Sequence, residues 1–237
     1  MSNAPLADRV RTAILDSILK EEFTGGRLPS ENVLAEMLNV SRTTIRTALY
    51  SLAQEGVVTR RRALGTTVNA HVRPASLGLQ RLVGFDALLA EKGYDVVVDT
   101  DWKRTRPPRD IVELFEVPEG EEVLLTEKRY HADGALAIYV RDAVLWSELK
   151  SPESLKKRLP PSMFEFSRQS FRRPVDHAVV EIIAVVKRDG NTQLEVPEGE
   201  AFTRLHEHHY STAGESLAMS IVDIDDAFVR FEVVRRQ

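Results

Sequence analysis

Residues 28–60 constrain the fold of this chain more than any other stretch, because they read as two short helices joined by a tight turn. Ser30 can cap the first helix and Ser41 the second, which ends at Gly56. Apolar residues recur at helical spacing in both segments, at Val33, Leu34, Met37 and Leu38, and then at Ile45, Ala48, Leu49 and Leu52. The pattern predicts a helix-turn-helix, followed by a β-hairpin that begins near Val57.

The start of the second helix is polar, and it is expected to face solvent. It carries two arginines, Arg42 and Arg46, and two hydroxyls, Thr43 and Thr44. A helix-turn-helix places this end in the major groove of DNA, where arginine can bind guanine and the helix N-terminus favours phosphate. The alternative is an ordinary helical hairpin with solvated charges. The basic run at residues 60–62 favours DNA binding, because it falls where the hairpin would meet the DNA backbone.

In these residues the chain resembles the winged-helix domain of the GntR family of bacterial transcription regulators. The shared motifs are LPSE at 28–31, VSRTT-x-R-x-AL at 40–49, L-x-x-EG at 52–56 and GT-x-V at 65–68. Two positions depart from the family: Asn32 replaces an arginine, and the tip at 63–65 lacks the usual Gly-basic-Gly, so the family's operator sequence is not carried over. Pattern and resemblance together predict DNA contacts from Ser30, Ser41, Arg42, Thr43, Thr44, Arg46, Arg60, Arg61, Arg62, Gly65 and Thr66.

Composition excludes several classes of protein. Of the 237 residues, 43% are hydrophobic and 29% are charged, which is typical of a globular chain. No cysteine occurs, so disulfides, thiol catalysis and cysteine-based metal sites are excluded. The apolar runs are short and the N-terminus lacks the order of a signal peptide, so we expect a cytoplasmic protein without a membrane partner.

Charge is distributed unevenly along the chain. Residues 1–73 hold 10 Lys+Arg against 7 Asp+Glu, a net charge of +3, whereas the remainder holds 22 against 29, a net of −7. We therefore predict a DNA-binding domain at 1–69, a linker at 70–79 and a control domain at 80–237. A single copy of this weakly basic DNA-binding domain should bind DNA poorly, so we expect a homodimer on a short inverted repeat.

The second domain contains an internal repeat, because EVPEGE at 116–121 recurs at 195–200. Each copy precedes a predicted hairpin, so two related halves are expected to face each other across one antiparallel sheet, with a pocket between them. Proline and glycine explain the hexapeptide itself as a turn. The expected strands are 94–105, 122–131, 136–145, 174–187, 201–211, 216–225 and 228–235; the expected helices are 84–92, 151–159, a short one after Pro108, and one opened by Ser162.

This half resembles the UTRA ligand-sensing domain of the GntR subfamily that includes the histidine-utilisation repressors. The resemblance covers roughly residues 75–235. It implies an α+β domain with an antiparallel sheet, similar to chorismate lyase, in a two-domain chain. Members of that subfamily are usually homodimers that bind small metabolites, often anionic ones.

The resemblance also suggests where a ligand would bind. The family often carries Arg-x-Arg on the strand before Ala132-Asp133-Gly134, and that pair falls here on Lys128 and Tyr130, or one residue later on Arg129 and His131. Alternation along a strand puts only one of these pairs on the inward face. An offset of 80 places His208 and Tyr210 on Lys128 and Tyr130. The remaining candidates for ligand contact are Phe85, Tyr139, Ser162, Ser167, Arg168, Ser220 and Asp223.

Catalysis and cofactors find little support in the sequence. A P-loop, a GxGxxG motif and a nucleophile elbow are all absent. Histidines two apart at 206 and 208 share a strand face but lack an evident third ligand, so no metal is expected. We therefore predict a ligand-controlled DNA-binding regulator without enzymatic activity. A repressor is the expected kind of regulator. The alternatives are a purely structural second domain and an enzyme fused to a helix-turn-helix.

Overall fold

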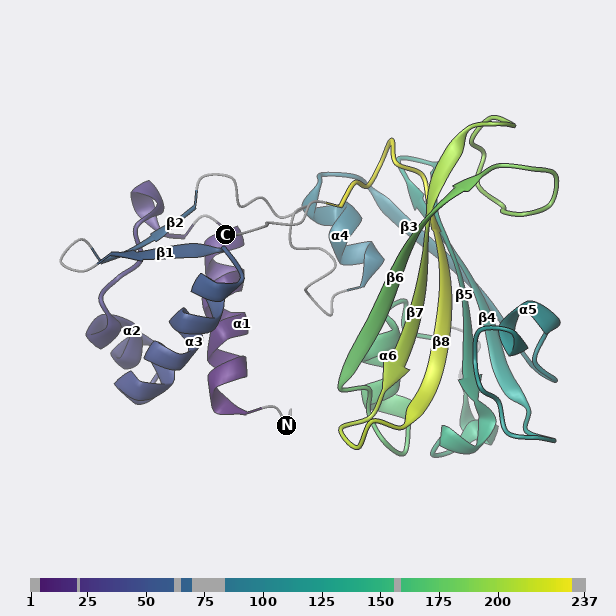
Figure 1. Cartoon of the computed structure of the whole chain (residues 1–237), viewed down its shortest axis with the longest axis horizontal. Coiled ribbons are helices and arrows are strands. Elements are labelled where there is room, and N and C mark those ends of the chain that lie inside the picture. The colour runs from purple at the N-terminus through teal and green to yellow at the C-terminus, as the bar shows by residue number, and fades with distance from the viewer. Residues whose placement is uncertain (1–4, 21, 62–64, 70–83, 156–158, 232–237) are drawn as a thin grey trace. The chain divides into compact units, whose positions relative to one another are not determined.

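The chain forms two compact units in a computed structural model that describes residues 5–20, 22–61, 65–69, 84–155 and 159–231. The described part of the first unit is residues 5–69, and that of the second is residues 84–231. Figure 1 shows their elements.

The first unit is a three-helix bundle with a two-stranded antiparallel wing. Its elements are α1 (Leu6–Leu19), α2 (Glu31–Met37), α3 (Arg42–Gln54), β1 (Val58–Arg61) and β2 (Gly65–Val68). Ile14, Ile45 and Leu49 lie at its centre and are at most 2% exposed. This is the winged helix predicted from the sequence.

The apolar stripe expected on α2 is only half buried. Leu34 and Ala35 lie in the core and Leu38 packs against it, but Val33 and Met37 are 44% and 64% exposed. The reason is the length of α2, which has seven residues and can present only about two turns to α3.

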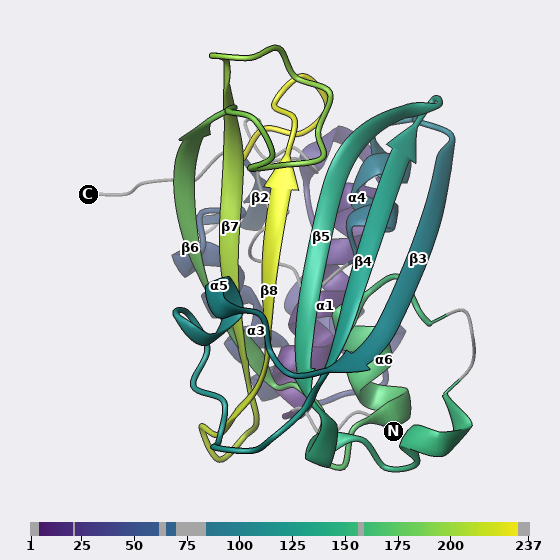
Figure 2. The same ribbon diagram turned by 90° about the vertical axis from the view of Figure 1, so that its right-hand side faces the viewer.

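The second unit is an α+β domain built on one six-stranded antiparallel sheet, as predicted. Its elements are α4 (Phe85–Glu91), β3 (Val96–Thr105), α5 (Arg109–Val112), β4 (Val123–Ala132), β5 (Ala135–Leu145), α6 (Met163–Ser170), β6 (His177–Val186), β7 (Ala201–Tyr210) and β8 (Ser216–Ile224). The strand order is β3-β4-β5-β8-β7-β6, so β3 and β6 form the two edges (Figure 2). Each half of the internal repeat supplies three consecutive strands, and the halves meet where β5 pairs with β8.

The two halves are related by an approximate two-fold axis through the sheet. Both hairpins shift register at the same point, between Tyr130 and His131 in one and between His209 and Tyr210 in the other, which is an offset of 79 residues. The register therefore makes Glu207 the counterpart of Lys128. The offset of 80 that paired Lys128 with His208 is wrong by one residue.

The two faces of the sheet are covered differently. We call the face that carries Leu124, Lys128 and Tyr130 the helical face, because α4 and α6 pack on it. The opposite face packs against α5 and against the loop that carries Leu194.

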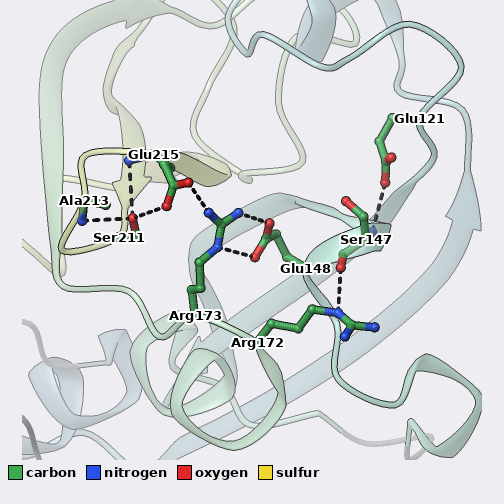
Figure 3. Close-up of polar contacts among 8 residues, drawn as sticks. All are labelled: Glu121, Ser147, Glu148, Arg172, Arg173, Ser211, Ala213 and Glu215. Atoms are coloured by element: carbon green, nitrogen blue, oxygen red, sulfur yellow. Dashed lines mark hydrogen bonds and ion pairs between the residues drawn. The ribbon is translucent and has the colours of Figure 1, made fainter.

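An arginine ion-pair group ties the loops at one end of the sheet together. Arg173, just before β6, pairs with Glu148 after β5 and with Glu215 in the β7–β8 turn (Figure 3). Arg172 adds a bond from its Nε to the carbonyl of Ser147, at 3.0 Å. The start of β6 is therefore fixed to elements of both halves.

Two predicted elements differ in the structure. In its described part, the helix expected at 151–159 is a 3₁₀ turn at Pro152–Ser154, and residues 156–158 lie outside the described residues. Residues 225–231 form turns and coil where a strand was expected from 228, and 232–235 lie outside the described residues. Within the ranges given above, the structure contains no helix long and apolar enough to cross a membrane.

Candidate nucleic-acid interface and candidate ligand site

The N-terminus of α3 is capped and solvent-exposed. The Ser41 hydroxyl accepts a bond from the Thr44 N–H at 3.1 Å and lies 2.8 Å from the Thr44 hydroxyl. Arg42, Thr43 and Arg46 are exposed around this cap. The Ser30 hydroxyl likewise accepts from the Val33 N–H, at 3.4 Å, and caps α2. The two serines therefore fix helix ends, while the residues after Ser41 are available to a partner.

Glu31 joins helix α3 to the wing. One of its carboxylate oxygens lies 3.2 Å from Arg46 Nη2, and the other lies 2.5 Å from Arg60 Nη2. Arg46 remains 60% exposed in its side chain, so its guanidinium can still reach outward. This carboxylate was not among the predicted site residues. The LPSE motif contained it, but sequence alone does not show its two arginine partners.

The wing contributes part of the predicted basic surface. Arg61 is exposed, whereas Thr66 is buried and its carbonyl accepts the Leu28 N–H at 3.0 Å. Gly65 has φ +87°, a conformation that side chains rarely adopt, which explains glycine there. Arg62 lies outside the described residues, so its predicted contact stays a prediction.

A buried polar network on the helical face is centred on Asp142. Lys128 Nζ lies 2.8 Å from a carboxylate oxygen of Asp142, and each side chain is 2% exposed. The hydroxyls of Thr126 and Ser220 donate to the same carboxylate at 2.8 and 2.6 Å. Burial opposes the ionised form, but Lys128 and these hydroxyls outweigh it and hold the pKa of Asp142 below its ordinary value. The positive charge of Lys128 is therefore already compensated by Asp142.

Lys128 and Tyr130 share a second acceptor, the carbonyl of Pro161. Both Lys128 Nζ and the Tyr130 hydroxyl donate to it at 2.8 Å, directly before the Ser162 cap of α6. The Phe85 ring meets the Tyr130 ring edge to face, with 6.0 Å between centroids. Five predicted ligand residues are thus brought together: Phe85, Lys128, Tyr130, Ser162 and, through Asp142, Ser220.

His209 extends the network and has a defined tautomer. Ser220 has one hydroxyl hydrogen, which Asp142 accepts, so the Ser220 oxygen must accept from His209 Nε2, 2.9 Å away. Burial lowers the pKa of His209 to about 4, so the ring is neutral. Its Nδ1 is therefore an unprotonated acceptor, and it is buried without a hydrogen bond from any described residue.

Glu207 is a second buried group without a hydrogen bond among the described residues. Burial, with the nearby charge of Asp142, raises the pKa of Glu207 to about 8. Its carboxyl lies 3.8 Å from His209 Nε2, which is too long for a hydrogen bond. Glu207 and His209 were not predicted as site residues. Applying the 79-residue offset of the EVPEGE repeat to Lys128 and Tyr130 would have found them.

The other predicted ligand residues lie on the opposite face or away from this network. Arg129 pairs there with Asp101 and Glu127 and lies over the Tyr139 ring, and Asp223 pairs with Arg204 at 2.6 Å. Alternation along the strands also turns His131 and His208 to that face, so the pair Lys128 and Tyr130 is the one on the helical face. His177 stacks on Tyr210, Arg168 is exposed at the end of α6, and Ser167 is buried within it. Among the described residues, no group of three or more potential ligands is close enough to hold a metal ion.

Comparison with known protein families agrees with this architecture. The model for bacterial regulatory proteins of the gntR family matches residues 6–68, and the UTRA domain model matches residues 100–221, which is half of the chain. The chain belongs to the GntR family, in its UTRA subfamily. The family consists of regulatory proteins, not enzymes, which agrees with the prediction from the sequence.

Individual relatives of this GntR protein are distant. It is 32% identical over 144 residues to the HTH-type transcriptional regulator GgaR of Escherichia coli, covering 57% of this chain and 55% of that protein. It is 30% identical over 116 residues to a probable fructoselysine utilization operon transcriptional repressor of Shigella flexneri, covering 48% of this chain and 46% of that one. The chain thus spans about half the length of the curated relatives it matches. The crystal structure of the possible regulator YydK from Bacillus subtilis matches 99% of this chain and 100% of its own, with a TM-score of 0.68 and 17% identity, and therefore supports the fold alone.

Proposed function

We propose that this chain is a DNA-binding transcriptional repressor whose operator binding is controlled by a small metabolite held on the helical face of the second unit. The observation that carries the first part is the capped, solvent-facing start of α3 in a GntR-family winged helix. A relative described as an operon repressor supports the direction of control. We expect the acting species to be a cytoplasmic homodimer on a short inverted repeat, because one recognition helix neutralises few phosphates.

Operator binding tests the assignment of α3. Replacing Arg42 and Arg46 together by alanine should cost at least roughly 1–3 kcal/mol of binding free energy, since each is placed to reach a base edge. The measurement is fluorescence anisotropy on an operator selected from random DNA. Arg9→Ala, Arg11→Ala on α1 is the matched control with the same change in charge. Equal affinity for wild type and the α3 double variant would show that α3 does not read the DNA.

The chemistry of the metabolite follows from His209 and Glu207. Because His209 Nδ1 is a buried acceptor without a hydrogen bond among the described residues, a ligand that brings a hydroxyl or amine hydrogen satisfies a group whose burial is otherwise costly. The Glu207 carboxyl lies beside it, and its pKa of about 8 keeps it largely protonated at neutral pH, so it can both donate to a ligand and accept from it. The family resemblance implies an anionic ligand, for which Lys128 or Arg129 was the candidate cation, but on the helical face Asp142 already compensates Lys128. We therefore propose a metabolite that carries hydrogen-bond donors as well as an anionic group. The anionic group is expected to lie near Ser162, at the start of α6.

A thermal-shift screen tests this site. Matched pairs such as glucose with glucose 6-phosphate, and ethanolamine with phosphoethanolamine, separate the donor requirement from the anionic one. A compound that stabilises wild type and releases operator should lose its effect in Glu207→Leu, which has no polar side-chain group, and keep it in Arg129→Ala, whose side chain lies on the opposite face. A releasing compound that stabilises all three proteins equally would place the ligand elsewhere.

A further inference from the structure

The two edge strands of the sheet differ in a property that controls association. Although β3 and β6 occupy equivalent positions in the two halves, β3 carries four charged side chains, namely Asp99, Asp101, Lys103 and Arg104, whereas β6 carries Glu181 alone. Charges on an edge strand prevent its open backbone from pairing with another chain. Of the two edges, β3 has this protection and β6 lacks it.

β6 carries exposed apolar side chains on both faces of the sheet, and its outer edge has backbone groups that point outward. Val179, Ile182 and Val186 are 57%, 52% and 45% exposed. The Lys187 N–H donates to the Glu200 carbonyl at 2.8 Å, and the direction of backbone groups alternates along a strand, so the N–H and C=O of Ile182 point away from β7. Among the described residues β6 has a strand partner on one side only.

The charges that flank β6 make the strand complementary to itself. Asp176 precedes it, and Lys187 and Arg188 follow it, so an antiparallel second copy brings an acidic end against a basic end. In a dimer whose two-fold axis passes through the joined sheet, side chains that oppose each other across the axis lie on the same face of that sheet. A register centred on Glu181 would oppose two like charges, which is destabilising. A register centred on Ile182 instead places Asp176 opposite Arg188 at both ends.

We propose that β6 pairs with β6 of a second copy of this chain, antiparallel and centred on Ile182, so that two sheets join into one. This rests on the homodimer of the proposed function and adds where the two copies meet. The start of β6 is already anchored by the ion pairs of Arg173 to Glu148 and Glu215 (Figure 3), so the strand is held in place for pairing.

The test places charges on the axis of the proposed dimer. In Ile182→Lys and in Ile182→Glu, like charges meet across the axis, so self-association should weaken at least roughly tenfold in each. An equimolar mixture of the two variants should recover dimers, because lysine then faces glutamate. Val97→Lys is the matched control, since Val97 is 55% exposed on the other edge strand. Sedimentation velocity at micromolar concentration measures association, and circular dichroism checks that each variant is folded.

The outcomes separate this inference from the proposed function. A wild-type dimer that Ile182→Lys leaves intact overturns pairing through β6 but not the dimer. Variants that dissociate and do not recover on mixing overturn the register centred on Ile182. A wild-type monomer that binds operator tightly overturns both the β6 pairing and the dimeric repressor. Dissociation of both variants with recovery on mixing, and an unaffected Val97→Lys, is the expected result.

Discussion

Replacing Lys128 by methionine should be among the most destabilising single changes on the helical face. The substitution leaves the Asp142 carboxylate buried with two hydroxyl donors and no cation. Breaking a buried ion pair by removing one partner typically costs about 3–5 kcal/mol, and the remaining hydroxyls favour the lower end. For a unit of this size each kcal/mol lowers the melting temperature by roughly 2–4 °C, so we expect a fall on the order of 10 °C.

The double variant Lys128→Met, Asp142→Asn separates the ion pair from packing. It removes both charges, so it should recover most of the lost stability, and urea unfolding at neutral pH gives the coupling energy. Arg129→Met is the control on the same strand; its ion pairs are partly exposed, so its cost should stay within about 1 kcal/mol. A cost for Lys128→Met as small as that of the control would refute the buried pair.

The pH dependence of the same variant has a definite sign. In the wild type the pKa of Asp142 lies below its unfolded value, so this group's stabilisation is present at neutral pH and is lost as pH falls through the folded pKa. Without Lys128, burial dominates and raises the pKa of Asp142 instead. The deficit of the variant relative to wild type should therefore shrink on acidification from pH 7 toward pH 4. A constant deficit over that range would contradict this cause.

Three further outcomes follow from groups described above. Glu207→Gln should remove a loss of stability that the wild type shows as pH rises from about 5 to 8, because a folded pKa of about 8 lies above the unfolded one; unfolding at several pH values measures this. Ser41→Ala should cost about 1 kcal/mol of stability through loss of the α3 cap, seen in thermal unfolding. Arg61→Ala should weaken binding to all DNA sequences alike and reduce the slope of log affinity against log salt by about one, measured by a salt titration.

The sequence predicted the fold well because its signals are local. Helix caps at Ser30 and Ser41, turn residues in EVPEGE and alternation along the strands each act within a few residues, and the structure contains the elements that they predict. The exposed side of α2 was missed because periodicity shows which residues share a face but not how much of that face a short helix buries.

The candidate ligand site was predicted only in part, because its contacts are long-range. Lys128 was named, but its partner Asp142 lies on the neighbouring strand, and a choice between two alternating pairs needs the hairpin register. Asp133 and Gly134 set that register with positive φ in the turn, and this turns Lys128 toward the helices. Glu207 and His209 were missed because an offset one residue too long exchanged the two faces of β7.

Glu31 should affect how the winged-helix domain binds DNA that is not its operator. Its single carboxylate occupies one arginine of α3 and one of β1, so two of the cations nearest the predicted groove are partly compensated. A phosphate that engages them must displace the carboxylate, and the exchange releases fewer counterions than two free arginines would. We therefore expect random duplex to be bound weakly and released quickly. At the operator, hydrogen bonds from base edges should compensate the arginines for the loss of Glu31, so we expect the complex to live longer there.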